Sequence, residues 1–392
     1  MQIQELISEL RLFLLHNSHP HPLNFMKLTL LVISIALAAA AQAQQLTARF
    51  YVGTGAKGAE SAITLCELNL KDGTVSVVDT FNNVQGPGYV SLSPDQRYLY
   101  SVNQDHTIAA FAVGQGGTLT YLDKQPAEGM NPCHVSVHPS GKMAFLANYT
   151  SGTWAAFPIA ANGAVKPASA EFAFTGSGPD QARQTKPHAH CALPSPNGKY
   201  VYVADLGTDR LMNYTVDANS GKVAPNPAQN HFSSRPGEGP RHLAFHPSGK
   251  YLYLLTEMKA TLMACAVDAR GVVTEIETVN TLPKDFAGNN SASAVRLHPN
   301  GRFVYVSNRG YNAIHGYEIQ KNGGLKSIGE IREGIDIPRD FNFDPSGKFM
   351  VIGNQKTNDL TVYRVDPKSG KMTFLNKSIG LKDPICFEFL GS

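Results

Sequence analysis

The sequence has few cysteines, and their number is odd. Disulfide frameworks use an even number of cysteines at close spacing, whereas the five cysteines of this 392-residue chain lie far apart. Each one falls in a short apolar run, where a free thiol behaves as a small hydrophobic side chain. We therefore expect five free, buried core residues: Cys66, Cys133, Cys191, Cys265 and Cys386.

The chain also has little net charge. A formal charge of +3 is too small to indicate nucleic acid or an acidic membrane surface as a partner. The composition, 42% hydrophobic and 17% charged, is typical of a globular protein and excludes a disordered or fibrous chain.

Long apolar runs are missing except near the N-terminus. The stretch MKLTLLVISIALAAAAQAQQ, from Met26, has a lysine, a short apolar run and an Ala-x-Ala site ending at Ala43. This pattern predicts a secretory signal peptide over residues 26–43, with a buried N-terminal helix as the alternative. The apolar run is too short to span a bilayer comfortably. We expect residues 1–25 to be a non-structural upstream extension and residues 44–392 to be a single exported domain, periplasmic or secreted.

The main positive feature is a repeat of about fifty residues. GPGYVSLSPDQRYLYSVN, NPCHVSVHPSGKMAFLANY, KPHAHCALPSPNGKYVYVADLG, GPRHLAFHPSGKYLYLLTE, SASAVRLHPNGRFVYVSNRG and IPRDFNFDPSGKFMVIGNQ are copies of one unit. Their turn prolines are Pro94, Pro139, Pro196, Pro247, Pro299 and Pro345, spaced by 45 to 57 residues. Each unit contains four short strand patterns separated by Pro- or Gly-containing turns, which is typical of one blade of a β-propeller.

The two ends of the chain carry complementary parts of a unit. DPICFEFLGS matches only a first strand, while RFYVGTG, ITLCELN and DGTVSVV match a second, third and fourth. We therefore predict an all-β, seven-bladed propeller whose ring is closed by pairing the N- and C-terminal strands in one blade. A sandwich or a solenoid does not explain these complementary ends.

In such a blade, the start of strand one and the end of strand two lie on the same face. Charged side chains at these two places are costly in a crowded channel unless they are paired or functional. The residues that stand out are His190, Arg241, Glu257 and Arg309, although inter-blade ion pairs would also account for the last two. His138, His246 and His298 recur beside the turn prolines, so we expect them to stabilise turns on the opposite face.

These stretches, taken together over residues 49–390, resemble the lactonase family of seven-bladed propellers, which includes the cycloisomerase-type 6-phosphogluconolactonases. Fungal carboxymuconate cyclases are distant relatives, and their proposed His, Arg, Glu and Arg set falls on His190, Arg241, Glu257 and Arg309. The resemblance implies hydrolysis of a sugar lactone such as 6-phosphogluconolactone or a related aldonolactone. The family's usual Gly-Thr-Tyr-Thr stretch is replaced here by Gly-Thr-Gly-Ala, starting at Gly53.

Lactone hydrolysis needs an activated water and donors for the developing oxyanion. His190 or Glu257 fits the general base, and Arg241 and Arg309 fit the oxyanion or an acidic substrate group. We expect four further residues to contact or support substrate: His188, Asp205, Arg339 and Gln355.

Three alternatives remain open. His188 and His190 have a spacing that metal sites use, but the sequence identifies no third ligand, so we predict no metal and no other cofactor. A cycloisomerase could bind a muconate-like diacid between two arginines. A non-catalytic binding propeller is the third, although a single tryptophan, Trp154, disfavours propellers with repeated Trp-Asp dipeptides or tryptophan docking motifs.

Overall fold

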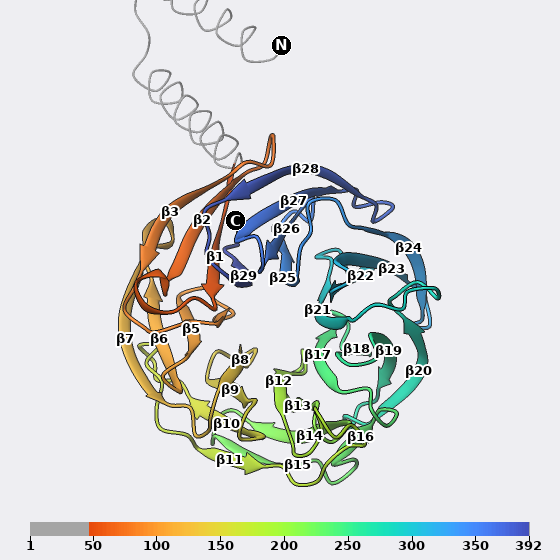
Figure 1. Ribbon diagram of the computed structural model, residues 1–392. Coiled ribbons are helices and arrows are strands. Elements are labelled where there is room, and N and C mark those ends of the chain that lie inside the picture. Colours follow the sequence, from red (N-terminus) through yellow and green to blue (C-terminus); the bar gives the residue numbers. More distant parts are fainter. Residues whose placement is uncertain (1–46, 392) are drawn as a thin grey trace, which may run out of the picture. The chain divides into compact units, whose positions relative to one another are not determined.

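A computed structural model describes residues 47–391, which form seven antiparallel sheets arranged as a ring (Figure 1). The predicted signal peptide, residues 26–43, and the predicted extension, residues 1–25, lie outside the described residues. Within residues 47–391, no helix is long and apolar enough to cross a bilayer. The prediction of an all-β, seven-bladed propeller is confirmed.

Blades are numbered here in chain order from the one that holds the N-terminal strands. Blade 1 consists of Pro384–Phe389 (β29), Thr47–Thr54 (β1), Ile63–Asn69 (β2) and Val75–Phe81 (β3). Blade 2 consists of Tyr89–Leu92 (β4), Tyr98–Asn103 (β5), Thr107–Val113 (β6) and Leu119–Pro126 (β7). Blade 3 consists of Pro132–Val137 (β8), Met143–Asn148 (β9), Thr153–Pro158 (β10) and Ala170–Ala173 (β11). Two single-turn 3-10 helices are Gly58–Glu60 (η1) and Gln115–Gly117 (η2).

The remaining blades repeat this order. Blade 4 consists of Ala189–Pro194 (β12), Tyr200–Asp205 (β13), Arg210–Asp217 (β14), Lys222–Pro225 (β15) and His231–Ser233 (β16). Blade 5 consists of Pro240–Phe245 (β17), Tyr251–Thr256 (β18), Thr261–Val267 (β19) and Val273–Asn280 (β20). Blade 6 consists of Ser291–Leu297 (β21), Phe303–Arg309 (β22), Ala313–Ile319 (β23) and Leu325–Ile331 (β24). Blade 7 consists of Pro338–Phe343 (β25), Phe349–Asn354 (β26), Asp359–Val365 (β27) and Met372–Ile379 (β28).

The ring closes through blade 1, as the complementary ends predict. Strand β29 pairs antiparallel with β1, with Phe50 opposite Phe389 and Val52 opposite Phe387. The C-terminal strand is thus the innermost strand of the blade whose other three strands come from the N-terminal part. This closure pairs strand edges that would otherwise stay open to other chains.

Two repeated hydrogen bonds tie neighbouring blades together. A tyrosine in the second strand donates its buried hydroxyl to a turn carbonyl of the next blade at five of the seven interfaces; these tyrosines are Tyr51, Tyr100, Tyr202, Tyr253 and Tyr305. Directly after the first strand of blades 3, 5 and 6, His138, His246 and His298 contact the turn carbonyls of Gly198, Gly301 and Gly347 in the next blade. The prediction that these histidines stabilise turns is confirmed.

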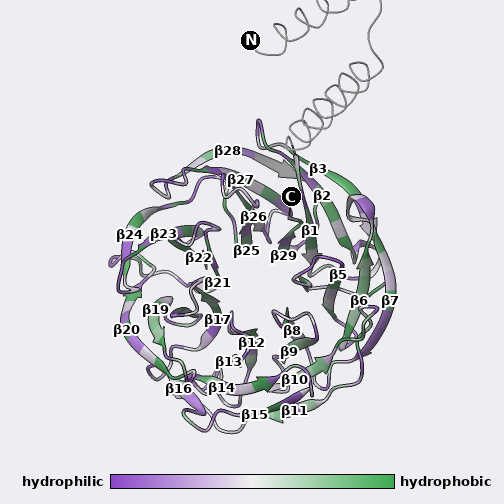
Figure 2. Ribbon diagram, turned by 180° about the vertical axis from the view of Figure 1, so that it is seen from behind, coloured by the Kyte–Doolittle hydropathy of each residue, from purple (hydrophilic) through white to green (hydrophobic). Residues whose placement is uncertain are grey.

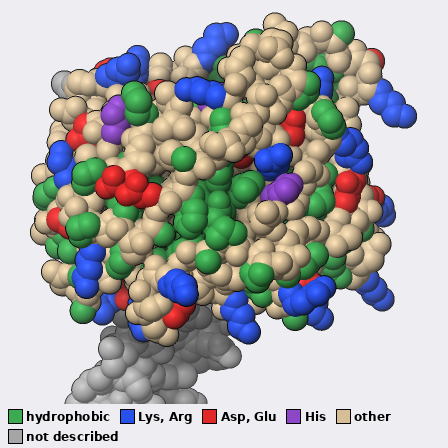
Figure 3. All heavy atoms as spheres, turned by 90° about the horizontal axis from the view of Figure 1, so that it is seen from below, with side chains coloured by type: hydrophobic (Ala, Val, Ile, Leu, Met, Phe, Trp, Pro, Cys, Tyr) green, Lys and Arg blue, Asp and Glu red, His purple; other side chains and the backbone are tan. Residues whose placement is uncertain are grey.

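Apolar side chains fill the space between neighbouring blades. Between blades 3 and 4, for example, Phe145 and Trp154 pack in one buried cluster with Val201, Val203 and Tyr214. Hydrophobic colour follows the middle strands of the blades, and hydrophilic colour is found mostly on turns and outer strands (Figure 2). The side of the ring that is at the bottom of Figure 1 has apolar side chains at its centre, surrounded by basic and acidic ones (Figure 3).

Candidate active site

The residues of the candidate site lie at β-bulges where the inner strands begin. The pairing of β8 with β9, β12 with β13 and β17 with β18 skips one residue each: Cys133, His190 and Arg241. The corresponding irregularities in blades 6 and 7 contain Ser293 and Arg339. A bulged residue has no partner across the ladder, so its side chain is re-aimed, here toward the channel mouth.

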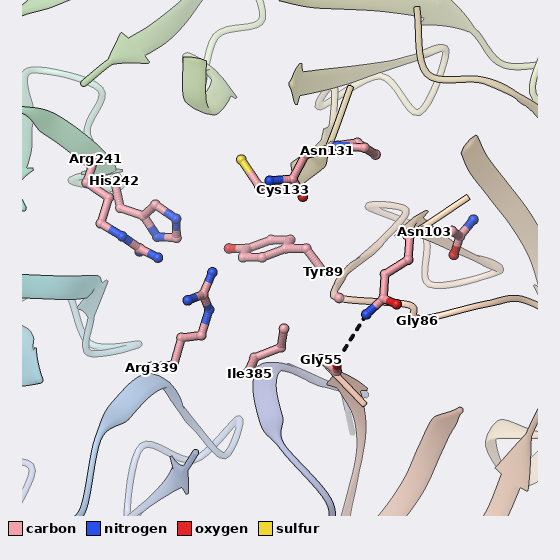
Figure 4. A pocket seen from close by; sticks show the side chains of 13 residues that line it. Gly55, Gly86, Tyr89, Asn103, Asn131, Cys133, Arg241, His242, Arg339 and Ile385 are labelled. Atoms are coloured by element: carbon pink, nitrogen blue, oxygen red, sulfur yellow. Dashed lines mark hydrogen bonds between the residues drawn. The ribbon is translucent and has the colours of Figure 1, made fainter. Parts of the chain in front are cut away.

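Hydrogen bonds connect three of the four neighbouring pairs of bulges. The Sγ atom of Cys133 lies 3.5 Å from the carbonyl oxygen of His190, and Nη1 of Arg241 donates to the carbonyl oxygen of Ser293 at 2.6 Å. The hydroxyl of Ser293 then donates to the carbonyl of Arg339 at 2.5 Å. These bonds join the bulges of blades 3 and 4 and, separately, those of blades 5, 6 and 7, and the two groups together form an arc across five blades. Cys133, Arg241 and Arg339 from this arc line a pocket together with Tyr89 and His242 (Figure 4).

Glu257, which directly follows β18, is the centre of an ion-pair cluster beside this pocket. Its Oε2 lies 2.9 Å from Nε of Arg241, 3.3 Å from Nη2 of Arg309 and 3.9 Å from Nε2 of His190. Its Oε1 accepts a hydrogen bond of 2.7 Å from Nη2 of Arg183. The four residues predicted to be catalytic are therefore brought together around one carboxylate.

Burial and charge determine the protonation states in the cluster. Burial alone favours a neutral Glu257, but the guanidinium groups of Arg241 and Arg309 outweigh it and hold the pKa of this carboxyl well below its usual range. Burial, reinforced by Arg241, keeps the pKa of His190 well below its ordinary value. Burial and Arg241 lower the pKa of Arg309 to about 9, so it stays charged at neutral pH. An ionised Glu257 thus faces a neutral His190.

Arg339 has a different environment from the paired arginines. It lines the pocket, and its guanidinium donates no hydrogen bond to any residue within 47–391. Burial and the nearby charge of Arg241 both lower its pKa. A desolvated guanidinium with free donors is suited to bind an anionic group.

The comparisons with known proteins agree with this architecture. The sequence profile of the family described as Lactonase, 7-bladed β-propeller, matches residues 49–389. This chain belongs to that lactonase family. It is 36% identical to the 6-phosphogluconolactonase of Bacillus subtilis, over 87% of this chain and 97% of that protein. It is 31% identical to the 6-phosphogluconolactonase of Formosa agariphila, over 81% of this chain and 92% of that protein.

A solved structure is similar over nearly the whole propeller. The periplasmic gluconolactonase PpgL of Pseudomonas aeruginosa superimposes with a TM-score of 0.83 at 26% identity. The match covers 88% of this chain and 99% of that one. The lactonase propeller described here therefore has the fold of a protein whose name states an activity on gluconolactone.

Three of the predicted substrate-binding residues do not line the pocket of this lactonase. Nδ1 of His188 lies 2.9 Å from the carbonyl oxygen of Tyr149, and its ring stacks on the Tyr149 ring. Asp205 is fully buried, and its oxygens accept hydrogen bonds from the backbone of His188 and Gly207 and from the Thr208 hydroxyl. Gln355 directly follows β26. These contacts give His188 and Asp205 local structural partners, and substrate binding by all three stays a prediction.

The same contacts bear on the metal alternative for His188 and His190. Their ring nitrogens have different partners: Nδ1 of His188 contacts the Tyr149 carbonyl oxygen, whereas the nitrogens of His190 face Glu257 and Cys133. In the part of the chain that the structure describes, no three His, Cys, Asp or Glu side chains are grouped to hold a metal ion.

Sequence reasoning missed several residues of the site; Tyr89 and His242 line the pocket, and Arg183 and Cys133 contact the predicted residues. Arg183, which pairs with Glu257, lies in the long connection between β11 and β12, outside the repeated unit. Cys133 was expected in the core; the other four cysteines are buried, but this one is only half-buried and lines the pocket, with Sγ 3.8 Å from Nδ1 of His190. All five are free thiols, as predicted. The signal that could have identified Cys133 is its position in the repeat. It directly follows the proline that opens the first strand, as Arg241 does in blade 5.

Proposed function

We propose that this lactonase hydrolyses a sugar lactone, either 6-phosphogluconolactone or a related aldonolactone. The observation that supports this best is a neutral His190 beside an ionised Glu257, at the edge of a pocket lined by two arginines. The relatives named 6-phosphogluconolactonase and gluconolactonase support the same reaction class.

His190 is the general base in this proposal. Both oxygens of Glu257 are engaged by guanidinium groups, so this carboxylate is a poor proton acceptor. The neutral imidazole of His190 accepts a proton from water as the water oxygen attacks the lactone carbonyl carbon. Glu257 stabilises the resulting imidazolium. The imidazolium then returns the proton to the ring oxygen as the carbon–oxygen bond breaks, which yields the open hydroxy acid.

The arginines provide the positive charge that this reaction needs. Arg241 uses Nε for Glu257 and Nη1 for Ser293, so its Nη2 is available to a substrate in the pocket. Arg339 has its whole fork available among the described residues. Donors fixed in advance at the position of a developing oxyanion stabilise the transition state more than the ground state. Arg309 keeps Glu257 ionised and adds to the positive field.

Export is the second part of this proposal. The signal-peptide pattern from Met26 to Ala43 supports it, and the Pseudomonas aeruginosa relative is named as periplasmic. A periplasmic or secreted lactonase meets unphosphorylated sugar lactones, so δ-gluconolactone is the first substrate to test. Cell fractionation and the mass of the mature N-terminus check this part; an uncleaved chain in the cytoplasm contradicts it.

The activity is tested by following ring opening of δ-gluconolactone and its 6-phosphate, and lactonisation of a muconate. We expect turnover of at least one lactone and none of the muconate. Lactonisation alone would instead identify a cycloisomerase, and no turnover with retained ligand binding would identify a binding propeller. In folded His190→Ala and Arg241→Ala variants we expect losses of about 100-fold or more in kcat/KM. Near-wild-type rates in both variants contradict the assigned roles.

A further inference from the structure

The Glu257 cluster beside the pocket includes an arginine from outside the repeated unit. Strand β11 ends at Ala173 and β12 begins at Ala189, so the connection between blades 3 and 4 comprises residues 174–188. It is the longest connection between successive blades; the next longest, between β20 and β21, comprises residues 281–290. Arg183 lies in this connection.

The backbone beside Arg183 is held in place by its neighbour Gln184. This side chain is fully buried and donates from Nε2 to the carbonyl of Leu206 and to Oδ1 of Asp209, both at 2.8 Å. A Cβ atom at Gly178 would lie 2.4 Å from Oε1 of Gln184, so the loop packs closely against this anchor. The position from which the Arg183 side chain extends is therefore well defined.

The guanidinium of Arg183 is only partly used by the protein. Its Nη2 donates to Oε1 of Glu257 at 2.7 Å and to the hydroxyl of Tyr149 at 3.2 Å. Its Nε and Nη1 donate to no residue within 47–391. The side chain is 42% exposed, compared with 2% for Arg241 and 14% for Arg309. Arg183 is thus the most solvent-exposed arginine of the three, and its Nε and Nη1 groups are available to a ligand.

Glu257 does not depend on Arg183 alone. Its other oxygen pairs with Arg241 and Arg309, so a ligand that takes over Arg183 leaves the carboxylate with two cationic partners. The cluster contains four guanidinium groups, those of Arg183, Arg241, Arg309 and Arg339. The negative charges near them are those of Glu257 and, close to Arg339, Asp383. The site therefore has an excess of positive charge.

We propose that Arg183 is a specificity-determining residue that binds the acidic group of an anionic lactone at the pocket mouth. The proposal rests on the function proposed above. A guanidinium group binds phosphate or carboxylate oxygens through charge-assisted hydrogen bonds, and Nε and Nη1 of Arg183 are free to make such contacts. An uncharged lactone does not need this contact.

Kinetics with two substrates of different charge test the proposal. KM and kcat are measured for δ-gluconolactone and for its 6-phosphate with wild type, Arg183→Gln and Arg183→Lys. For Arg183→Gln we expect KM for the phosphorylated lactone to rise about tenfold or more, because a charge-assisted contact is lost. KM for δ-gluconolactone should change by less than about threefold, and Arg183→Lys should restore part of the loss. Equal changes for both lactones overturn the proposal and indicate a purely structural link to Glu257.

Lys186 provides the matched control. It lies in the same connection, is exposed, and donates only to the carbonyl of Thr150 at 2.7 Å. Lys186→Ala removes one positive charge from the loop without touching the Glu257 cluster. We expect both KM values to stay at wild-type level; a rise for the phosphorylated lactone equal to that of Arg183→Gln would show a general charge effect and overturn the assignment.

Ligand binding without turnover separates this proposal from the proposed function. Calorimetric titration with 6-phosphogluconate and with gluconate is performed on wild type and on Arg183→Gln. Weaker binding of 6-phosphogluconate in the variant, with unchanged gluconate binding, supports the role of Arg183 even if neither lactone is hydrolysed. Equal 6-phosphogluconate affinity in the two proteins, or no binding by wild type, overturns it.

Discussion

Nε2 of His190 lies 3.9 Å from Oε2 of Glu257, an oxygen that Arg241 also contacts at 2.9 Å. The distance is too long for a hydrogen bond but short enough for strong electrostatic coupling. The carboxylate is already neutralised by arginines, so it does not draw a proton onto the imidazole. It does stabilise the positive charge that His190 acquires when it acts as a base.

This relationship predicts the pH dependence of the reaction. A base with a lowered pKa stays deprotonated to a lower pH, so the acid limb of kcat/KM should have its midpoint below 6.5, the ordinary value for histidine. Arg339→Ala removes a positive charge that lowers the pKa of His190, so it should move that midpoint upward. Lys186→Ala, at the exposed rim, should leave it in place. A pH–rate profile of δ-gluconolactone hydrolysis measures this, and a wild-type midpoint at or above 6.5 would contradict it.

Glu257→Gln tests the carboxylate as the anchor of the cluster. The substitution leaves two buried guanidinium groups, Arg241 and Arg309, without their anionic partner, so we expect the free energy of unfolding to fall by about 3 kcal/mol. Activity should fall as well, because the imidazolium of His190 loses its counter-charge. Urea unfolding and lactone turnover measure the two effects.

The same substitution at Glu275 is the control for stability. Glu275 pairs with Arg235 at 2.8 Å on the surface, where the arginine side chain is 56% exposed. Glu275→Gln should cost less than about 1 kcal/mol. Equal costs at the two positions would mean that the Glu257 cluster is no more than an ordinary surface ion pair.

The ring and its closure were predictable because they depend on patterns that repeat along the chain. The turn prolines mark the blades, and the complementary ends identify the blade that β29 and β1 complete. The grouping of His190 with Glu257 followed from the same repeat, since equivalent strand ends must share a face. Residues at equivalent positions of the repeat share one rim, so the rim that holds a residue of the unit can be predicted from the sequence.

Contacts that depend on distances of a few ångströms were not predictable. The sequence does not indicate the bulges that re-aim Cys133 and Arg241, because a bulge changes pairing by one residue without a composition signal. Arg183 lies in a connection with no counterpart in other blades. The choice of base between His190 and Glu257 depends on how many guanidinium groups contact the carboxylate, which only the structure describes.

The tyrosine that links blades 4 and 5 predicts a modest stability effect. The hydroxyl of Tyr202 donates to the carbonyl of Gly271 at 2.8 Å, and Asn213 donates to the same oxygen at 2.7 Å. Tyr202→Phe therefore removes one buried hydrogen bond without leaving the carbonyl unpaired, and we expect a loss of about 1 kcal/mol. Tyr200→Phe, which removes an exposed bond to Ala269, should cost less than about 0.5 kcal/mol. Urea titrations compare them, and equal costs would show that these inter-blade bonds add no stability.

Glu388, in the inner strand β29, predicts an unusual pH dependence of stability. Burial, opposed in part by Arg296, raises the pKa of this carboxyl to about 7, whereas in the unfolded chain it titrates near its ordinary value. The folded state therefore disfavours the ionised form. The stability that the protonated group provides is complete below the unfolded pKa and is lost as the pH rises to about 7. Since the side chain is half-buried, the loss should be below about 3 kcal/mol.

Glu388→Gln removes this titration while keeping the shape of the side chain. Relative to wild type, the variant should be about 1 to 2 kcal/mol more stable at pH 8 and about equal at pH 5, measured by urea unfolding at both values. Glu171→Gln, at an exposed position in β11, should leave the pH dependence unchanged. The nearby Arg296 keeps its bidentate contact with Asp340 in the variant, at 2.6 Å and 3.2 Å, so no buried charge is left unpaired. A variant that loses as much stability as wild type between pH 5 and pH 8 would show that Glu388 is ionised at little cost inside the channel.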